Sequence, residues 1–149
     1  MAFLVDTSIL LRLANSADRS YPVADRAVVE LRVRGEMLHL TPRNLVEFRN
    51  VATRPAAVNG LGLTPAAAEA KATGLEALFP LLTETPDIYP AWKALVARVG
   101  VIGKQAHDAR LVAVCHIYQV GQLLTFNTAH FASLARFGSV IVVVHPASV

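Results

Sequence analysis

The sequence contains almost no cysteine and few charged or aromatic residues. Cys115 is the only cysteine, which excludes a disulfide within the chain and a cysteine-based zinc site. Its neighbours in LVAVCHIY are apolar, so we expect a small buried side chain. With 17% charged and 54% hydrophobic residues, the composition is too apolar for a disordered protein. These values predict a globular domain with its own core.

Long hydrophobic runs and an export leader are missing as well. The least charged stretch never reaches the ~20 consecutive apolar residues of a spanning helix, because residues 111–135 are interrupted by His116, Gln119, Gln122, Asn127 and His130. The N-terminus lacks a basic segment followed by an apolar segment and a cleavage site. We therefore expect a cytoplasmic protein without membrane spans.

No linker rich in glycine, serine, proline or charge divides the chain, which predicts one domain over residues 1–149. The net charge of +3 and the pI of about 9.4 amount to a modest basic excess. Such an excess permits binding to a polyanion such as nucleic acid but does not identify the partner.

Apolar strand-like segments alternate with helix-like segments. The predicted strands are residues 2–6, 37–41, 122–126 and 139–145, and residues 81–83 resemble a further short strand. The predicted helices are residues 7–14, 22–34, 107–118 and 131–135, one that begins at Pro42, and two or three more before residue 107. Several strand segments are continuously apolar, as expected where helices cover both faces of a sheet. The alternation predicts the α/β class, as a three-layer α/β/α sandwich with a mostly parallel central sheet.

Asp6 follows directly after the first of these strands. A buried carboxylate without partners costs several kcal/mol or takes up a proton, so a partner is expected. In open parallel sheets, ligands bind beyond the carboxyl ends of the strands, near a switch in strand order. Asn127 follows the 122–126 strand and lies at the same edge. The sequence therefore predicts a binding site there.

The helix that begins at Pro42 is apolar on one face and polar on the other, at about 100° per residue. The polar face carries Arg43, Glu47, Asn50 and Arg54. This pattern has two interpretations, a solvated face whose arginines pair with Glu47 or a site that uses the carboxylate.

Two later polar residues can also be interpreted in two ways. Asp108 lies in the first turn of the 107–118 helix, on its apolar face, which directs the carboxylate towards the interior. An acid at a helix N-terminus is also a common cap. Asn127, close behind Thr125 at the end of a strand, is likewise a good N-cap.

Together, Asp6, Glu47 and Asp108 offer the oxygen ligands that Mg²⁺ or Mn²⁺ prefers, with waters in the remaining positions. Such an ion would be the missing partner of Asp6. The hydroxyl groups expected to hydrogen-bond these ligands or the water on the ion are those of Thr7, Ser8 and Thr125.

This arrangement resembles the PIN-domain ribonucleases, and most closely the VapC-type toxins of bacterial toxin–antitoxin pairs. The resemblance rests on VDTSILL, LVEF, HDARLVA and LLTFNTAHF and covers essentially the whole chain. It implies a PIN-like fold and a Mg²⁺- or Mn²⁺-dependent endoribonuclease, with catalytic residues Asp6, Glu47, Asp108 and Asn127. It also implies products with a 5′-phosphate and a 3′-hydroxyl, a small cognate antitoxin and a homodimer.

Asn127 stands where many members of that family carry a fourth acid. A neutral amide adds no negative charge, so we expect one firmly bound ion and leave a second open. His130 stands where such toxins often have an aspartate, and we interpret it as a peripheral contact to RNA or to the metal ligands. Because three carboxylates repel RNA, cations should surround them, and the candidates for phosphate contacts are Arg43, Arg54, Lys104 and Arg110.

Two other Mg²⁺-binding α/β classes do not fit. A receiver-type signalling domain needs a pair of acids after the first strand, and a haloacid-dehalogenase-like phosphatase needs a second aspartate where this chain has Ser8. Two alternatives stay open within the resemblance. They are a PIN-like protein that binds RNA or a partner without efficient catalysis, and a housekeeping RNA-processing nuclease.

Overall fold

The computed structural model describes residues 1–138 and 140–149. Within them, four strands form one parallel sheet in the order β2-β1-β3-β4. The strands are β1 (Ala2–Val5), β2 (Met37–His39), β3 (Gln122–Leu124) and β4 (Val142–Val144). Each strand is shorter than the segment that predicted it, and Ser139, where the last predicted strand begins, lies outside the described residues.

Successive side chains of β1 point to opposite faces of the sheet, because a strand has a period of two residues. Phe3 and Val5 join one buried cluster, whereas Leu4 joins a second. The neighbouring strand β3 repeats this division, with Leu124 in the first cluster and Leu123 in the second. Apolar residues on both faces are what a sheet between two helical layers requires.

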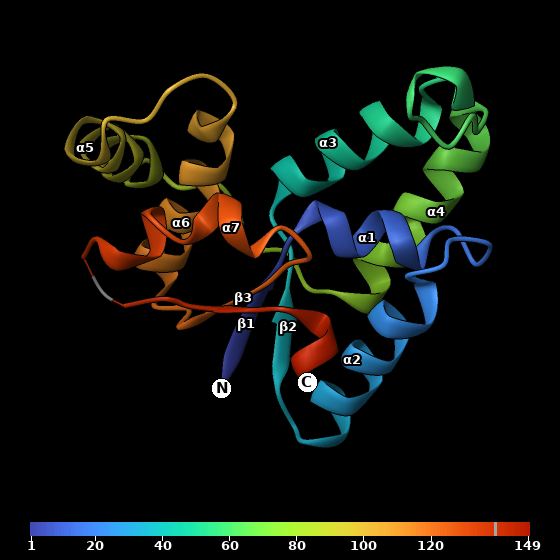
Figure 1. Ribbon diagram of the computed structural model, residues 1–149, viewed down its shortest axis with the longest axis horizontal. Coiled ribbons are helices and arrows are strands. Elements are labelled where there is room, and N and C mark those ends of the chain that lie inside the picture. Colours follow the sequence, from blue (N-terminus) through green and yellow to red (C-terminus); the bar gives the residue numbers. More distant parts are fainter. Residues whose placement is uncertain (139) are drawn as a thin grey trace.

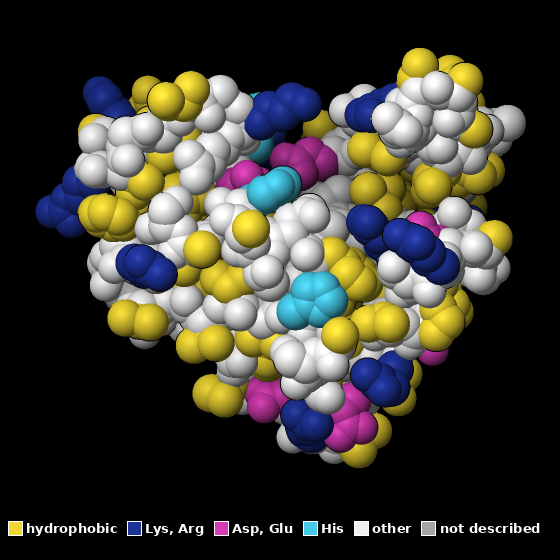
Figure 2. Space-filling view, in the orientation of Figure 1, with side chains coloured by type: hydrophobic (Ala, Val, Ile, Leu, Met, Phe, Trp, Pro, Cys, Tyr) yellow, Lys and Arg dark blue, Asp and Glu magenta, His cyan; other side chains and the backbone are white. Residues whose placement is uncertain are grey.

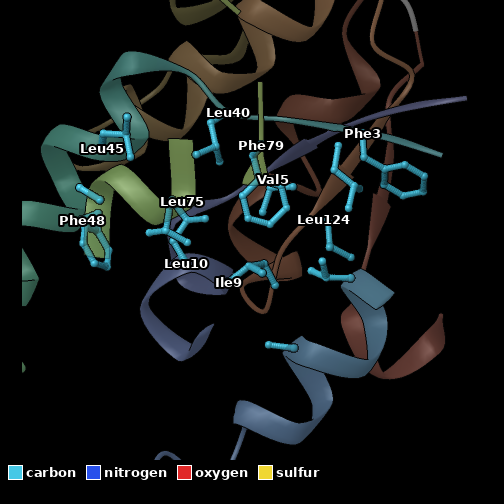
Figure 3. Close-up of a cluster of buried hydrophobic side chains, with 14 of the residues drawn as sticks. Phe3, Val5, Ile9, Leu10, Leu40, Leu45, Phe48, Leu75, Phe79 and Leu124 are labelled. Atoms are coloured by element: carbon cyan, nitrogen blue, oxygen red, sulfur yellow. The ribbon is translucent and has the colours of Figure 1, made fainter. Parts of the chain in front are cut away.

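Four helices pack on the first face of the sheet. They are α1 (Thr7–Leu13), α2 (Tyr21–Val33), α3 (Pro42–Thr53) and α4 (Pro65–Leu78) (Figure 1). Ile9 and Leu10 of α1 are fully buried there, as are Phe48 of α3 and Phe79 at the end of α4. Figure 3 shows these side chains in one buried cluster, in which Phe79 lies next to Val5. The apolar face of α3 thus packs in this cluster, and its polar face stays free of the core.

Three helices cover the opposite face, namely α5 (Ile88–Val99), α6 (Gln105–Tyr118) and α7 (Thr128–Phe131). Short 3₁₀ turns complete the chain at η1 (Ala56–Val58), η2 (Leu134–Arg136) and η3 (Pro146–Ser148). Val112 and Cys115 of α6 are buried in the second cluster with Leu4 and Phe131. Helices on both sides of a parallel sheet confirm the predicted three-layer α/β/α sandwich.

Two predicted elements were wrong. The helix predicted over residues 131–135 is divided, because α7 ends at Phe131 and a separate 3₁₀ turn follows. Residues 81–83 form no strand, since Leu81 makes only an isolated parallel bridge to Leu40. Both segments are short, so tertiary contacts outweigh their local pattern.

None of the helices in the described part of the chain is long and apolar enough to cross a membrane.

The order of the strands switches between β1 and β3, because the chain leaves β1 for β2 on one side and later places β3 on the other. Such a switch point opens a crevice at the carboxyl ends of the strands. Backbone hydrogen bonds continue one residue beyond the strands, from Asp6 N to Leu124 O (2.9 Å) and from Thr125 N to Val144 O (3.0 Å). They hold Asp6 and Thr125 side by side at this edge.

Candidate active site at the switch point of the sheet

Asp6 is buried, with 7% of its surface exposed, at the end of β1. It occupies the N-cap position of α1, but its side chain makes no capping hydrogen bond. Instead, its Oδ2 accepts two hydrogen bonds, from Ser8 Oγ and from Thr125 Oγ1, each 2.7 Å long. Hydroxyl donors to a charged oxygen offset part of the cost of burying it. Neither bond uses Oδ1.

Backbone amides orient both of these hydroxyl groups. Phe126 N donates to Ser8 Oγ (3.1 Å), and Asn127 N donates to Thr125 Oγ1 (2.9 Å). A hydroxyl has one proton and two lone pairs, so accepting from an amide leaves its proton available for the carboxylate. The chain after β3 thus fixes the carboxylate of Asp6 in place.

Glu47 of α3 is held by a chain of side chains that reaches back to the start of its own helix. Thr7 Oγ1 donates to Glu47 Oε2 (3.0 Å), and Asn44 Nδ2 donates to Thr7 Oγ1 (3.2 Å). The amide oxygen of Asn44 accepts from Thr41 N (2.9 Å) and Thr41 Oγ1 (2.8 Å) in a capping box. Asn44 is completely buried, and sequence reasoning missed it. The signal that could have identified Asn44 was its position three residues after Thr41, which is the spacing of a capping box, and three residues before Glu47.

Arg43 links Glu47 to the helix on the other side of the crevice. Its Nε lies 3.1 Å from Glu47 Oε1, one turn along α3, and a terminal nitrogen hydrogen-bonds Nδ1 of His107. The ion pair between Arg43 and Glu47 agrees with the interpretation in which arginines on the polar face of α3 pair with Glu47. Arg54 is not in this contact, because it lies beyond the last turn as the C-cap of α3.

Asp108 lies in the first turn of α6, whose N-cap is Lys104, so Asp108 is not the capping residue. Its pKa is raised from 3.8 to about 6, first by burial and then by the negative charge of Asp6, while His130 lowers it and Glu47 raises it. Asp6 and Glu47 therefore both act electrostatically on Asp108. Together the three form a concentrated negative site.

One hollow of about 280 Å³ contains all three carboxylates, and we call it the acidic hollow. It is lined by Asp6, Thr7, Ser8, Leu11, Arg12, Glu47, Asn50, Val51, Asp108 and Asn127. Figure 2 shows acidic side chains recessed between the two groups of helices, with histidine and basic side chains beside them. Segments from the beginning, middle and end of the chain meet here.

The acidic hollow is looser than a preformed metal site. Within residues 1–138 and 140–149, no group of three or more histidine, cysteine, aspartate or glutamate side chains is arranged to hold a metal ion. The carboxylates line one hollow and lie close enough for electrostatic interaction, but they are not arranged as a closed set of metal ligands.

Asn127 begins α7 at the N-cap position, but its side chain makes no capping hydrogen bond. It lines the acidic hollow, so the capping interpretation does not account for its amide. Lys104 and His130 line a neighbouring hollow of about 420 Å³ together with Asp108. A lysine and a histidine thus lie in one hollow with Asp108.

Arg12 lines the acidic hollow and is held by two contacts. Its Nη1 donates to Ser8 O (3.1 Å), and its guanidinium lies 5.0 Å from the ring centroid of Phe126. Arg110, in contrast, is paired with Glu84 at 2.5 Å. The structure thus places Arg12 in the same hollow as the three carboxylates.

The sequence is similar to one family of known proteins. The model of the PIN domain family matches residues 3–136. No curated protein matches the sequence closely enough to count as a relative.

Solved structures share the fold at low sequence identity. FitAcB from Neisseria gonorrhoeae is 15% identical with a TM-score of 0.69, covering 99% of each chain. VapC20 from Mycobacterium tuberculosis, described as a toxin that cleaves the sarcin–ricin loop, is 22% identical with a TM-score of 0.65, covering 88% of this chain and 94% of that one. VapBC2 from Rickettsia felis, bound to promoter DNA, is 15% identical with a TM-score of 0.68, covering 97% and 98%.

Proposed function

Because the chain belongs to the PIN domain family, we propose that it is a divalent-metal-dependent endoribonuclease, the toxin of a VapBC-type toxin–antitoxin pair. The observation that carries this proposal is the acidic hollow, where Asp6, Glu47 and Asp108 from three distant segments meet at the switch point of the sheet. Metal-assisted hydrolysis of an RNA phosphodiester needs negative ligands for a cation next to a surface that binds phosphate. The hollow and its basic surroundings offer both.

The donor set fits Mg²⁺ or Mn²⁺. Both ions prefer oxygen ligands, and Mg²⁺ usually takes one or two carboxylates and keeps several waters. That habit suits carboxylates that share a hollow without forming a closed cage. Asp6, Glu47 and Asp108 would hold the ion, and Asn127, which carries no charge, would add at most a neutral oxygen. When bound, the ion supplies Lewis acidity towards the phosphodiester and a more acidic water.

The residues around the carboxylates would keep them in position. Ser8 and Thr125 hold Asp6 through Oδ2, and Thr7 holds Glu47 through Oε2. Ligands that are already oriented need less rearrangement when a cation binds. In this proposal the three hydroxyl groups are positioning residues.

Phosphate contacts would come from the cations at the edges of the acidic hollow. Arg12 and Arg43 lie on the α1 and α3 side, and Lys104 lies on the α6 side. Arg110 and Arg54 stay in the proposal as more distant contacts. These charges would steer RNA to the site without reading its sequence.

Solved structures that share the fold support a proposal for the cellular role. Several of them are toxin–antitoxin complexes, such as one from Klebsiella pneumoniae (21% identity, TM-score 0.64). By analogy, this protein would be a cytoplasmic homodimer held inactive by a small antitoxin. A housekeeping RNA-processing nuclease and an RNA- or partner-binding protein without catalysis are the alternatives.

The test is cleavage of a structured RNA by the purified protein with Mg²⁺ or Mn²⁺. We expect Asp6→Asn and Asp108→Asn to reduce the rate by more than the about 10- to 100-fold that is typical for changes to residues that only support metal ligands. Glu76→Gln changes an exposed acid on α4 and should leave the rate unchanged. Equal cleavage by wild type and Asp6→Asn would point to a contaminant. Tight RNA binding without any cleavage would favour the binding-only alternative.

A further inference from the structure

Arg43 already neutralises one of the carboxylates that the proposed function assigns to a metal ion. Its Nε lies 3.1 Å from Glu47 Oε1, one helical turn along α3. Among the ion pairs that the structure describes, this is the one that engages a carboxylate of the acidic hollow. A positive side chain of the protein thus contacts an oxygen that a cation would need.

Glu47 is oriented without help from this arginine. Its other oxygen, Oε2, accepts a hydrogen bond from Thr7 Oγ1 (3.0 Å), and Asn44 Nδ2 donates in turn to Thr7 Oγ1 (3.2 Å). Thr7 and Asn44 are both buried, so these contacts are sheltered from water. The carboxylate therefore has a neutral partner that positions it through Oε2 and a charged partner at Oε1. The charge of Arg43 needs an explanation other than positioning.

The contact between Arg43 and Glu47 is one that another cation can replace. Nε of Arg43 is buried, yet within the described part of the chain it has no acceptor in hydrogen-bonding geometry. Charge rather than an aligned hydrogen bond therefore holds it beside Oε1, and an aligned bond would be the stronger one. The two side chains are 28% and 34% exposed, so water screens part of their attraction.

Arg43 also has partners away from Glu47. One of its terminal nitrogens hydrogen-bonds Nδ1 of His107 at the start of α6. The arginine lines a pocket of about 450 Å³ between α3, α5 and α6, together with Glu84, Trp92 and His107. Glu84 pairs there with Arg110 (2.5 Å) and offers a second carboxylate. The guanidinium can therefore leave Glu47 without becoming a buried, unpaired charge.

We propose that Arg43 is a built-in counter-ion of the metal site, which pairs with Glu47 in the metal-free protein and is displaced when a divalent cation binds Oε1. This inference rests on the proposed metal-dependent function and adds a control of metal affinity to it. Arg43 lowers the affinity of the acidic hollow for a cation because it occupies an oxygen and adds a like charge nearby. An arginine that only oriented Glu47 would have the opposite effect, since its loss would weaken metal binding.

Binding of Mn²⁺ to the protein without RNA tests this inference in the absence of turnover. Electron paramagnetic resonance measures the Mn²⁺ that stays free in a titration and gives the Kd. We expect Arg43→Met, which keeps an apolar stem and removes the charge, to bind Mn²⁺ about 3- to 30-fold more tightly than wild type. Arg43→Gln should show the same gain, so the test does not depend on the folding of one variant. Arg43→Lys keeps the charge and should bind Mn²⁺ as wild type does.

Arg49→Met is the matched control. It removes the same charge from the same helix, where Arg49 pairs with Glu69 of α4 (2.7 Å), and it should leave the Mn²⁺ affinity unchanged. Equal or weaker binding by Arg43→Met and Arg43→Gln would overturn the proposal. A gain of the same size in Arg43→Lys or in Arg49→Met would overturn it too, because the effect would then not come from the charge beside Glu47.

Asp6→Asn distinguishes a failure of this inference from a failure of the proposed function. If Asp6→Asn binds Mn²⁺ more weakly than wild type and the neutral Arg43 variants show no gain, the acidic hollow is the metal site and only the role of Arg43 is wrong. If wild type, Asp6→Asn and the Arg43 variants all bind Mn²⁺ equally, or none binds it, both proposals fail.

Discussion

At the scale of single residues, Asn44 shows how a side chain outside the acidic hollow can determine its geometry. It receives two hydrogen bonds from Thr41 at the start of α3 and gives one to Thr7, which in turn holds Glu47. One buried amide thus serves both a helix cap and a carboxylate of the site. A change at this position should be felt in stability as well as in activity.

We predict that Asn44→Ala lowers the free energy of unfolding by about 1–3 kcal/mol, because buried polar groups of Thr41 and Thr7 would lose a hydrogen bond. Urea denaturation measures this quantity. Asn50→Ala, an exposed position of the same helix, is the matched control and should stay within about 0.5 kcal/mol of wild type. Equal effects of the two changes would contradict the role assigned to Asn44.

Asp108 supplies a pH dependence with a definite sign. Its pKa is raised from 3.8 to about 6 in the folded protein, mainly by burial. The folded state therefore holds a proton more tightly than the unfolded state, and the contribution of this group to stability is lost as the pH rises from about 4 towards 7. Ionisation of Asp108 therefore lowers the stability of the metal-free protein.

Asp108→Asn should remove that cost. In EDTA, we expect the variant to have a higher Tm than wild type at pH 7.5 and a similar Tm near pH 4, where Asp108 is protonated. Thermal unfolding followed by circular dichroism over this pH range measures the difference. A difference in Tm that is constant with pH, or a less stable variant at pH 7.5, would show that burial of Asp108 does not govern stability.

At the scale of elements, α3 carries much of the site on one side and much of the core on the other. Phe48 is fully buried in the first cluster, while Glu47 and Arg43 face the crevice. Helical periodicity alone predicted this division, because residues three and four apart share a face. The polar side can serve a function only because the apolar side anchors the helix.

We predict that Phe48→Ala costs about 3–5 kcal/mol of stability, the usual effect of removing a large buried ring. Phe48→Leu keeps most of the apolar volume and should cost less than about 1.5 kcal/mol. Chemical denaturation of both variants gives the comparison. If the alanine variant were as stable as the leucine variant, α3 would not depend on this anchor.

Local signals predicted the elements better than the contacts between them. Pro42 and the polar stripe were enough to indicate α3, since capping and periodicity depend on neighbouring residues. The contact of Arg43 with His107 joins residues 64 positions apart, and no local pattern reports how α3 and α6 face each other. Asp6 and Asn127 were expected at one edge because parallel strands end together. The pocket lined by Arg43, Trp92 and His107 depends on how α5 packs beside α3 and α6. No local pattern in the sequence of α5 predicts that packing.

At the scale of the whole molecule, the net charge of +3 is small, so the distribution of the charges would decide how the proposed RNA substrate is attracted. The acidic hollow repels phosphate, and nearby cations such as Lys104 and Arg12 offset that repulsion. Binding should therefore weaken with salt according to the number of phosphates contacted.

Lys104→Ala should weaken binding to all RNA sequences alike and reduce the slope of log K against log salt by about 1. Lys71→Ala, at an exposed position of α4 on the other helical layer, is the control and should change neither quantity. Fluorescence anisotropy at several salt concentrations provides both numbers. An unchanged slope in Lys104→Ala would remove this lysine from the phosphate contacts.

The hydrogen bonds across the switch point also bear on biosynthesis. Asp6 and Glu47 are made early, but Thr125, whose hydroxyl orients Asp6, lies 119 positions further along the chain. A nascent polypeptide therefore carries two of its acids without the strand that aligns them. The carboxylates can therefore take up the arrangement of the acidic hollow only after β3 has been made and has paired with β1.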